Sequence, residues 1–397
     1  MDLRTLSTSG LLFALAAFGY HLAEPRLTEY DVRARVERLR AGEHIETPTT
    51  DREPPPVDAL VLFRRLEGVG VWLERRAPWR EGLGAPWRWE PSEAERLEEE
   101  LRPLGTFFHE IKRILDEDAC RRALADGRRL ARPAPLFGSS PEELLVDTPN
   151  MSAIRNWSNL LCARAIVASR RPETREEAAR RLGQALDLAQ LVDDGSSLGM
   201  FMRGMGTSIV MLAVRSLLDE GMDAGLLRRA LDDRLARAVR PEDCEGAFAS
   251  DVSRAVRVWE AVHRDGVEGI AGRFPVSSTA DLRTWLEDYE AHLAGARPLC
   301  AESELIGRSS AVRVWKLMEM DTVSMRLTLA AAQYRAEQGR PPASLEQLAE
   351  LFEDGIPSLT CGHARIELDA EAEDLHLVVR AAAEGSKACV PPRQLVP

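Results

Sequence analysis

Between residues 91 and 338 the sequence is a succession of helix-forming segments separated by short breaks. Several of these segments start at a capping residue and stop at a glycine or before a proline. Residues 174–192 show the pattern well, because Thr174 and Glu177 form a capping sequence and apolar residues follow at helical spacing. Short connections imply that consecutive helices are antiparallel neighbours. The chain is therefore predicted to be mainly α, with an antiparallel multi-helix bundle.

The predicted helices can be placed by their start and stop signals. In the helix that follows Thr174 we expect Leu182, Leu186 and Val192 to be buried on one stripe. The segment 198–220 is nearly all apolar, and Gly221 is expected to end it. Further helices are predicted over residues 28–40, 104–125, 150–170, 223–239, 241–264, 279–293 and 302–338.

Composition agrees with a globular helical protein. Apolar residues make up 45% of the 397 residues, charged residues 29% and aromatic residues only 6%, which disfavours disorder and all-β folds. The length suggests two or three domains. The net charge of -12 argues against a broad nucleic-acid-binding surface, so we expect no nucleic-acid partner. Almost every cation is an arginine, which suits fixed ion pairs with Asp and Glu.

The N-terminal segment from Leu6 to Ala23 contains no charged residue. Its 18 residues approach the roughly 20 that a helix needs to cross a bilayer. Its densest part also fits the apolar region of a signal peptide, but no good cleavage site follows. We prefer an uncleaved membrane anchor through residues 6–23 to a cleaved signal, and a buried N-terminal helix is the remaining alternative.

Arginines that follow the anchor bear on the topology. By the positive-inside rule they would hold the next residues in the cytoplasm, although large domains translocate despite such charge. We expect a protein of the cytoplasmic membrane whose body lies in the periplasm. The arginines concerned are Arg26, Arg33, Arg35, Arg38 and Arg40.

Four tryptophans lie close together after a proline-rich linker, and APWR occurs twice there, at 77–80 and 85–88. They could form an aromatic platform that binds a sugar, a peptide or a lipid headgroup. The alternative is a loop or hairpin whose tryptophans cover the edge of the core and stack with arginines. These candidate ligand-binding residues are Trp72, Trp79, Trp87 and Trp89.

Arg203 interrupts the apolar segment 198–220 and is a further candidate for ligand binding. A buried arginine requires an acid, for which Asp193, Asp194 and Asp219 are candidates, unless it faces a groove. The methionines around it could bind Cu(I), but methionine also fills irregular helix interfaces, and we favour packing. Gly204 and its glycine neighbours would let other helices approach closely.

Strong catalytic and metal-binding motifs are absent from the sequence. His109-Glu110 begins a zinc-binding pattern, but position 113 is arginine and the second histidine is missing. Cys361-Gly362-His363 could place a nucleophile beside a base, although a hairpin turn with a bridged cysteine explains it better. We therefore assign no catalytic residue, no metal and no cofactor, and the interpretation leans against an enzyme.

The C-terminal end changes character. Residues 364–368 and 375–379 are expected to form a β-hairpin in a small α+β module. Cys361 and Cys389 flank this hairpin, and antiparallel strands would bring the flanks close enough for a disulfide. The predicted organisation is an anchor over 1–24, a linker with the Trp-rich segment over 25–90, a helical domain over 91–324 and the tail over 325–397.

The segment from Met325 to Leu351 resembles a module of type II secretion pseudopilins, in which a helix ends in Tyr-Arg and leads through Gly-Arg-Tyr-Pro to a short helix and a small sheet. Unlike in pseudopilins, the matching helix is far from the anchor, and no prepilin peptidase site is present. The matching residues are Tyr334, Arg335, Gly339, Arg340, Pro341, Pro342, Ser344, Leu345 and Leu348.

About half of the chain is also similar to uncharacterised bacterial proteins of planctomycete and myxobacterial type, which carry an anchor, a helical middle and this tail. The resemblance implies a location more than an activity. Our leading hypothesis is a membrane-anchored interaction or scaffold protein with a protein partner, exposed outside the cytoplasmic membrane. The alternatives are a ligand-binding module that uses the Trp-rich segment or a helical groove, and a hydrolase with an unrecognised site.

Overall fold

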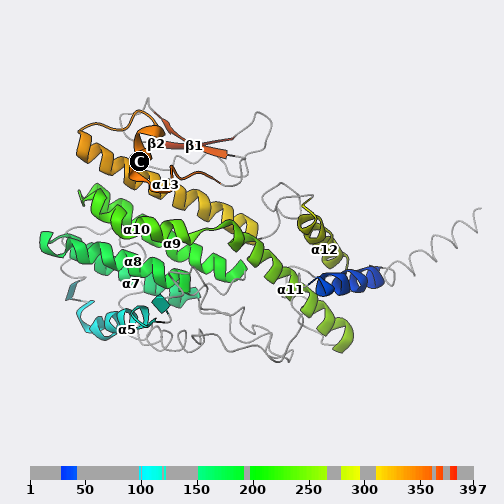
Figure 1. The fold of residues 1–397 in the computed structure, drawn as a ribbon. Helices are drawn as coiled ribbons and strands as arrows, with labels where there is room; N and C mark the ends of the chain where they lie inside the picture. The colour runs from blue at the N-terminus through cyan, green and yellow to red at the C-terminus, as the bar shows by residue number, and fades with distance from the viewer. Residues whose placement is uncertain are drawn as a thin grey trace, which may run out of the picture. The chain divides into compact units, whose positions relative to one another are not determined.

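The computed structural model shows a mainly helical chain, as predicted (Figure 1). Its residues group into two compact units. Unit 1 comprises Met1–Arg52 and Phe248–Ser309, and unit 2 comprises Glu53–Ala247 and Ser310–Pro397. The structure describes residues 28–42, 98–99, 101–118, 120–121, 151–191, 197–265, 279–295, 310–359, 364–369 and 376–381. The predicted anchor, Leu6 to Ala23, lies outside these ranges.

Unit 2 is a helical bundle in which α10 packs mainly against α8 and α13 and only slightly against α9, which precedes it in the chain. α7 and α8 contact each other and α9, while α13 packs against both α9 and α10 (Figure 1). The elements are η2 (Arg102–Leu104), α5 (Gly105–Leu115), α7 (Met151–Ser169), η4 (Pro172–Thr174), α8 (Arg175–Leu191), α9 (Ser197–Asp219), α10 (Ala224–Ala238) and α13 (Ser310–Gln338). α11 (Pro241–Asp265) begins in unit 2 and ends in unit 1.

The core of unit 2 is the apolar face shared by these helices. Leu182 and Leu186 of α8 are buried in it, which confirms the predicted stripe at these two positions. Val192, the third predicted member, lies outside the described residues. Met202 and Met211 of α9 belong to the same core, so they fill helix interfaces as expected.

Helix ends show where local sequence signals act. Gly221 has a φ of 79° and ends α9, and the Asp223 side chain caps α10 by accepting a hydrogen bond from the Leu226 amide at 3.1 Å. Thr174 lies directly before α8, at the predicted N-cap position, and is the last residue of the 3-10 turn η4 that joins α7 to α8. Its hydroxyl donates to the carbonyl oxygens of Ala168 and Arg171, which ties this turn to the end of α7.

The helix predicted over residues 104–125 is interrupted in the structure. α5 ends at Leu115, and residues 118 and 120–121 are helical again after a turn. Three acidic residues follow at 116–118, where the negative end of the helix dipole disfavours them. α13 begins at Ser310, and the predicted start at 302 falls outside the described residues.

The C-terminal part of unit 2 is continuous with the bundle through α13. Gly339, with a φ of 70°, follows α13, and the 3-10 helix η7 (Leu345–Leu351) then packs back on it. β1 (Ala364–Asp369) and β2 (His376–Ala381) pair antiparallel, with Ile366 opposite Val379. The residues that connect these strands, 370–375, lie outside the described ranges, as do Cys361 and Cys389. The self-contained α+β module therefore stays a prediction.

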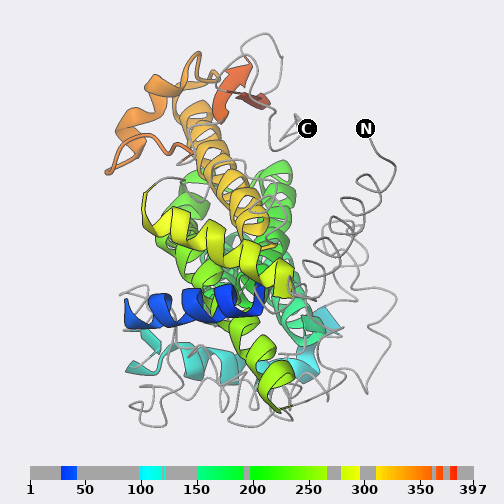
Figure 2. The same cartoon turned by 90° about the vertical axis from the view of Figure 1, so that its right-hand side faces the viewer.

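The described residues of unit 1 form three helical segments. Residues 28–41 form a helix, and it lies beside α12 (Thr279–Leu293) and the part of α11 beyond Phe248 (Figure 2). Val32, Val36 and Leu39 point from the first helix into the core of the unit and are buried. The ring of Phe248 stacks on Trp285 and meets Tyr289 edge-on, so aromatic contacts join α11 to α12.

Candidate functional site

The structure describes one of the five predicted ligand-binding residues. Arg203 lies in α9, whereas Trp72, Trp79, Trp87 and Trp89 lie outside the described residues. The aromatic platform therefore stays a prediction. The site that can be built is the group of charged side chains within unit 2, starting from Arg203.

Arg203 forms a buried ion pair with Asp243 at the start of α11. Its Nη2 lies 2.9 Å from Asp243 Oδ2, and the two side chains are only 3% and 12% exposed. The same carboxylate oxygen accepts a hydrogen bond from the backbone N–H of Arg240 at 3.3 Å. Asp243 thus joins α9 to the backbone that leads into α11. As a ligand-binding residue Arg203 stays a prediction.

The expectation that a buried Arg203 has an acidic partner is confirmed, and the partner that the structure shows is Asp243, forty residues further along the chain. Of the acids predicted for this role, Asp193 and Asp194 lie outside the described residues, and Asp219 is the last residue of α9. One sequence signal could have identified Asp243. It lies in the first turn of the helix that Pro241 begins, where a carboxylate can also satisfy a free backbone N–H.

Close helix contacts surround this ion pair. The indole N–H of Trp315 in α13 donates to the Arg240 carbonyl oxygen at 2.8 Å. On α9, a Cβ added to Gly204 would lie 2.8 Å from the Met318 sulfur, so the two helices approach closely here. A Cβ added to Gly206 would lie equally close, 2.8 Å, to the Ala189 methyl, which is fixed to the backbone of α8 and cannot rotate away. The expected role of these glycines in close packing is confirmed.

A second ion pair, which the sequence analysis missed, joins α8 to α10. Arg234 Nε lies 2.9 Å from both carboxylate oxygens of Asp187. Gly183 makes room for this guanidinium, since an added Cβ would lie 3.1 Å from Arg234 Nε. Burial raises the pKa of Asp187, against the opposing effect of Arg234. An aspartate among the buried apolar positions of α8 was the signal in the sequence.

A third cluster fastens the chain after α13 to the bundle. Arg228 of α10 donates to the Gln333 side chain at 2.7 Å and to the carbonyl oxygen of Leu351. Arg326 of α13 binds Asp232 of α10, with Nε at 2.8 Å from Oδ1. Both guanidinium groups also lie against the ring of Phe352, at 6.0 and 5.5 Å from its centre. η7 is thereby fixed on α10 and α13.

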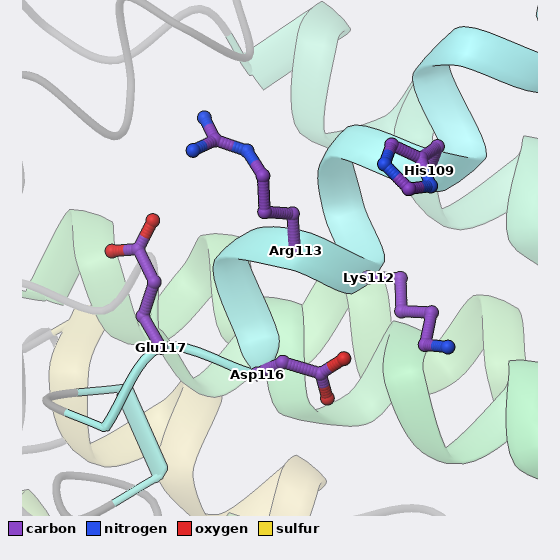
Figure 3. Close-up of a pocket in the computed structure, with 5 residues that line it drawn as sticks. All are labelled: His109, Lys112, Arg113, Asp116 and Glu117. Carbon is purple, nitrogen blue, oxygen red and sulfur yellow. The ribbon is translucent and has the colours of Figure 1, made fainter.

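An open hollow of about 270 Å³ lies on the surface at the end of α5 (Figure 3). All of its lining side chains come from this helix and the turn after it, and His109 and Arg113 point to different sides of it (Figure 3). Arg113 is paired with Glu110 at 2.7 Å, and this hydrogen bond raises the pKa of Arg113. Residues from one exposed helix face do not converge on a ligand. The lining residues are His109, Lys112, Arg113, Asp116 and Glu117.

Metal-binding side chains and cysteine thiols are the remaining groups that could support chemistry. In the described ranges, no group of three or more His, Cys, Asp or Glu side chains is placed to hold a metal ion. Cys120 and Cys162 are buried thiols, and burial raises the pKa of Cys162. A buried thiol with a raised pKa is unreactive, so Cys162 has a packing role.

One helix in the described part of the chain, α9 from Gly199 to Asp219, is long and apolar enough to cross a membrane. However, 61% of this span is buried among the other helices. Core helices of soluble bundles share these properties. The contacts of α9 with α7, α8 and α13 explain its apolar character as bundle packing.

Comparisons with known proteins add no family to this description. No protein-family model matches the chain. No curated protein and no solved structure is significantly similar to it either. The resemblance to the pseudopilin module therefore stays a prediction from the residues that carry it.

Proposed function

We propose that the protein is a membrane-anchored interaction or scaffold protein whose body lies outside the cytoplasmic membrane. The observation that carries the proposal is the position in the sequence of the first described helix, close behind the uncharged segment. The described helix 28–41 follows the uncharged segment Leu6–Ala23 after four intervening residues of the sequence and is packed into unit 1. An anchor at residues 6–23 would therefore hold a folded unit directly, without a long linker.

Ion pairs and burial both support this attachment. Arg38 Nη2 lies 3.0 Å from Glu290 of α12, and Arg40 makes two 2.9 Å bonds to Glu260 of α11. Arg35 contacts Glu287 at 3.1 Å and also Glu290. With its apolar side buried as well, the helix 28–41 is an integral part of unit 1.

α9 is the other apolar segment that could be considered as an anchor. Its residues contribute to the core of unit 2. They include Arg203, which is buried and forms an ion pair with Asp243. Placing α9 in a lipid bilayer would remove these contacts and expose an arginine to hydrocarbon, which costs several kcal/mol, on the order of 3. We therefore assign the anchor to residues 6–23.

Fractionation tests the anchor. Full-length protein should stay with membranes after carbonate extraction, whereas a chain that begins at Glu24 should be recovered in the soluble fraction. The shorter chain keeps the whole of unit 1 that the structure describes, so its recovery in folded form is the control. Intact full-length protein in the soluble fraction would contradict the proposal.

Lysine labelling tests the side of the membrane on which the body lies. The chain has only three lysines, and Lys112 is exposed on α5. A membrane-impermeant amine reagent should modify Lys112 in intact spheroplasts, and a Lys112→Arg variant controls for the peptide identified. Modification that requires lysis would place the body in the cytoplasm.

The predicted disulfide provides an independent test of the compartment. If Cys361 and Cys389 are joined, peptide mapping of protein that was blocked with a thiol reagent at lysis should recover them as one linked pair. The buried thiol Cys162 should be found unlinked and serves as the internal control. Free, alkylated Cys361 and Cys389 would remove the bridge and weaken the case for export.

The scaffold role predicts stable association. Cross-linking in intact membranes should give discrete adducts with other proteins, and the same adducts should survive detergent extraction. A chain that remains monomeric by cross-linking and by native electrophoresis of the extract would contradict an interaction role while leaving the anchor intact.

A further inference from the structure

We infer that the first turn of helix 28–41, through Tyr30, contacts the lipid headgroups of the membrane to which the protein is anchored. The inference rests on the proposed function, because it takes residues 6–23 as the anchor. It adds which part of the body lies against the bilayer and which side chain makes the contact.

Chain length places this turn near the membrane. Five peptide steps separate Ala23 from Thr28, and an extended chain spans at most about 17 Å over that distance. Thr28 therefore lies within about 17 Å of the end of an anchor at residues 6–23. Its first turn is the first part of the described body that the membrane can meet.

The side chains of the helix leave one candidate for that contact. Val32, Val36 and Leu39 are already buried in unit 1, so the helix has no free apolar face with which to lie flat in the interface. Tyr30 is 75% exposed, the highest value among the large apolar side chains described as exposed. Tyrosine is favoured at the membrane interface, where its ring meets the acyl chains and its hydroxyl meets water.

Charge does not dominate this contact. In the same turn, Glu29 binds Arg33 at 2.7 Å and Asp31 binds Arg35 at 3.1 Å, so acids and bases are balanced. Arg33 is 61% exposed and can still donate to a headgroup. Glu37 is exposed on the same side of the helix as Tyr30, about 10 Å further along the helix axis. An anionic membrane surface would repel Glu37. The helix is therefore expected to meet the membrane with its N-terminal end.

Photocross-linking in the full-length chain tests the inference. The photoreactive residue benzoylphenylalanine is placed at position 30 or, as the matched control on the same stripe, at position 37. The protein is reconstituted into vesicles of phosphatidylethanolamine and phosphatidylglycerol, and lipid adducts are measured by mass spectrometry. We expect several-fold more lipid adduct at position 30 than at 37, with little change at high salt.

The outcomes separate this inference from the proposed function. Full-length protein that is embedded in the vesicles but gives no lipid adduct at position 30 would overturn the contact and leave the anchor standing. Equal adducts at 30 and 37 would overturn the end-on orientation, and a protein adduct at 30 would assign Tyr30 to a partner. Protein that does not associate with the vesicles would overturn both proposals.

Discussion

The two units use arginine in different ways. In unit 1, Arg35 and Arg40 bridge helices at a surface where their carboxylate partners remain partly exposed. In unit 2, Arg203 and Asp243 are almost completely removed from water. Exposed pairs are screened and contribute little, whereas breaking a buried pair leaves a charge without solvent. The same residue type therefore orients helices in unit 1 and is expected to be indispensable for packing in unit 2.

The largest effect is expected from Asp243→Ala. Arg203 would keep its buried charge without the carboxylate at 2.9 Å, so the free energy of unfolding should fall by about 3–5 kcal/mol. Urea unfolding measures it. The double variant Arg203→Leu/Asp243→Leu is the control, because it removes both charges and should recover most of the loss. If Asp243→Ala lowered the free energy of unfolding by less than the double variant does, a buried ion pair would be contradicted.

Two glycines of α9 sharpen the comparison by testing packing without charge. Gly206→Ala should lower the free energy of unfolding by about 1–3 kcal/mol, because its Cβ would clash with the Ala189 methyl, which no side-chain rotation can move. Gly204→Ala should cost less, since the flexible Met318 side chain can move and alanine favours the helix. Thermal unfolding distinguishes them, and a costlier Gly204→Ala would show that Met318 is held rigidly.

The pH dependence of unfolding tests Asp187. Burial raises its pKa in the folded protein above the ordinary value of 3.8, so the folded state binds the proton more tightly than the unfolded state does. This contribution is complete below about pH 3.8 and is lost as pH rises through the folded-state pKa. Relative to Asp187→Asn, the wild-type free energy of unfolding should therefore decrease as pH rises above 4. If the stability of the wild type relative to Asp187→Asn instead increased with pH, the pKa of Asp187 would be lowered in the folded protein.

The smallest effect is expected at the ion pairs of unit 1. Arg40→Gln should lower the free energy of unfolding by about 1 kcal/mol or less, and the difference should shrink in about 1 M salt. Arg33→Gln is the control, because its bond to Glu29 lies within one exposed helix and should contribute still less. A large, salt-resistant loss at Arg40 would place this pair in the same class as Arg203–Asp243.

Much of the fold could be predicted because helix periodicity and helix ends are local. The prediction of residues 279–293 agrees with α12, and that of 223–239 differs from α10 by one residue at each end. The α5 end was missed, since the apolar pattern continues while the acids at 116–118 oppose the dipole. The candidate site was predicted less well, because Arg203 was identified but its partner was not.

By itself the sequence determined several helix ends, such as those at Gly221 and Asp223, because these signals and the apolar spacing act within a few residues of one another. Only the tertiary structure decided which charged side chains form ion pairs. Arg40 binds Glu260, 220 positions further along the chain, and Arg203 binds Asp243, forty positions further along. Backbone caps depend on neighbours along the chain, whereas an ion pair between helices depends on which faces pack together and how much water they exclude.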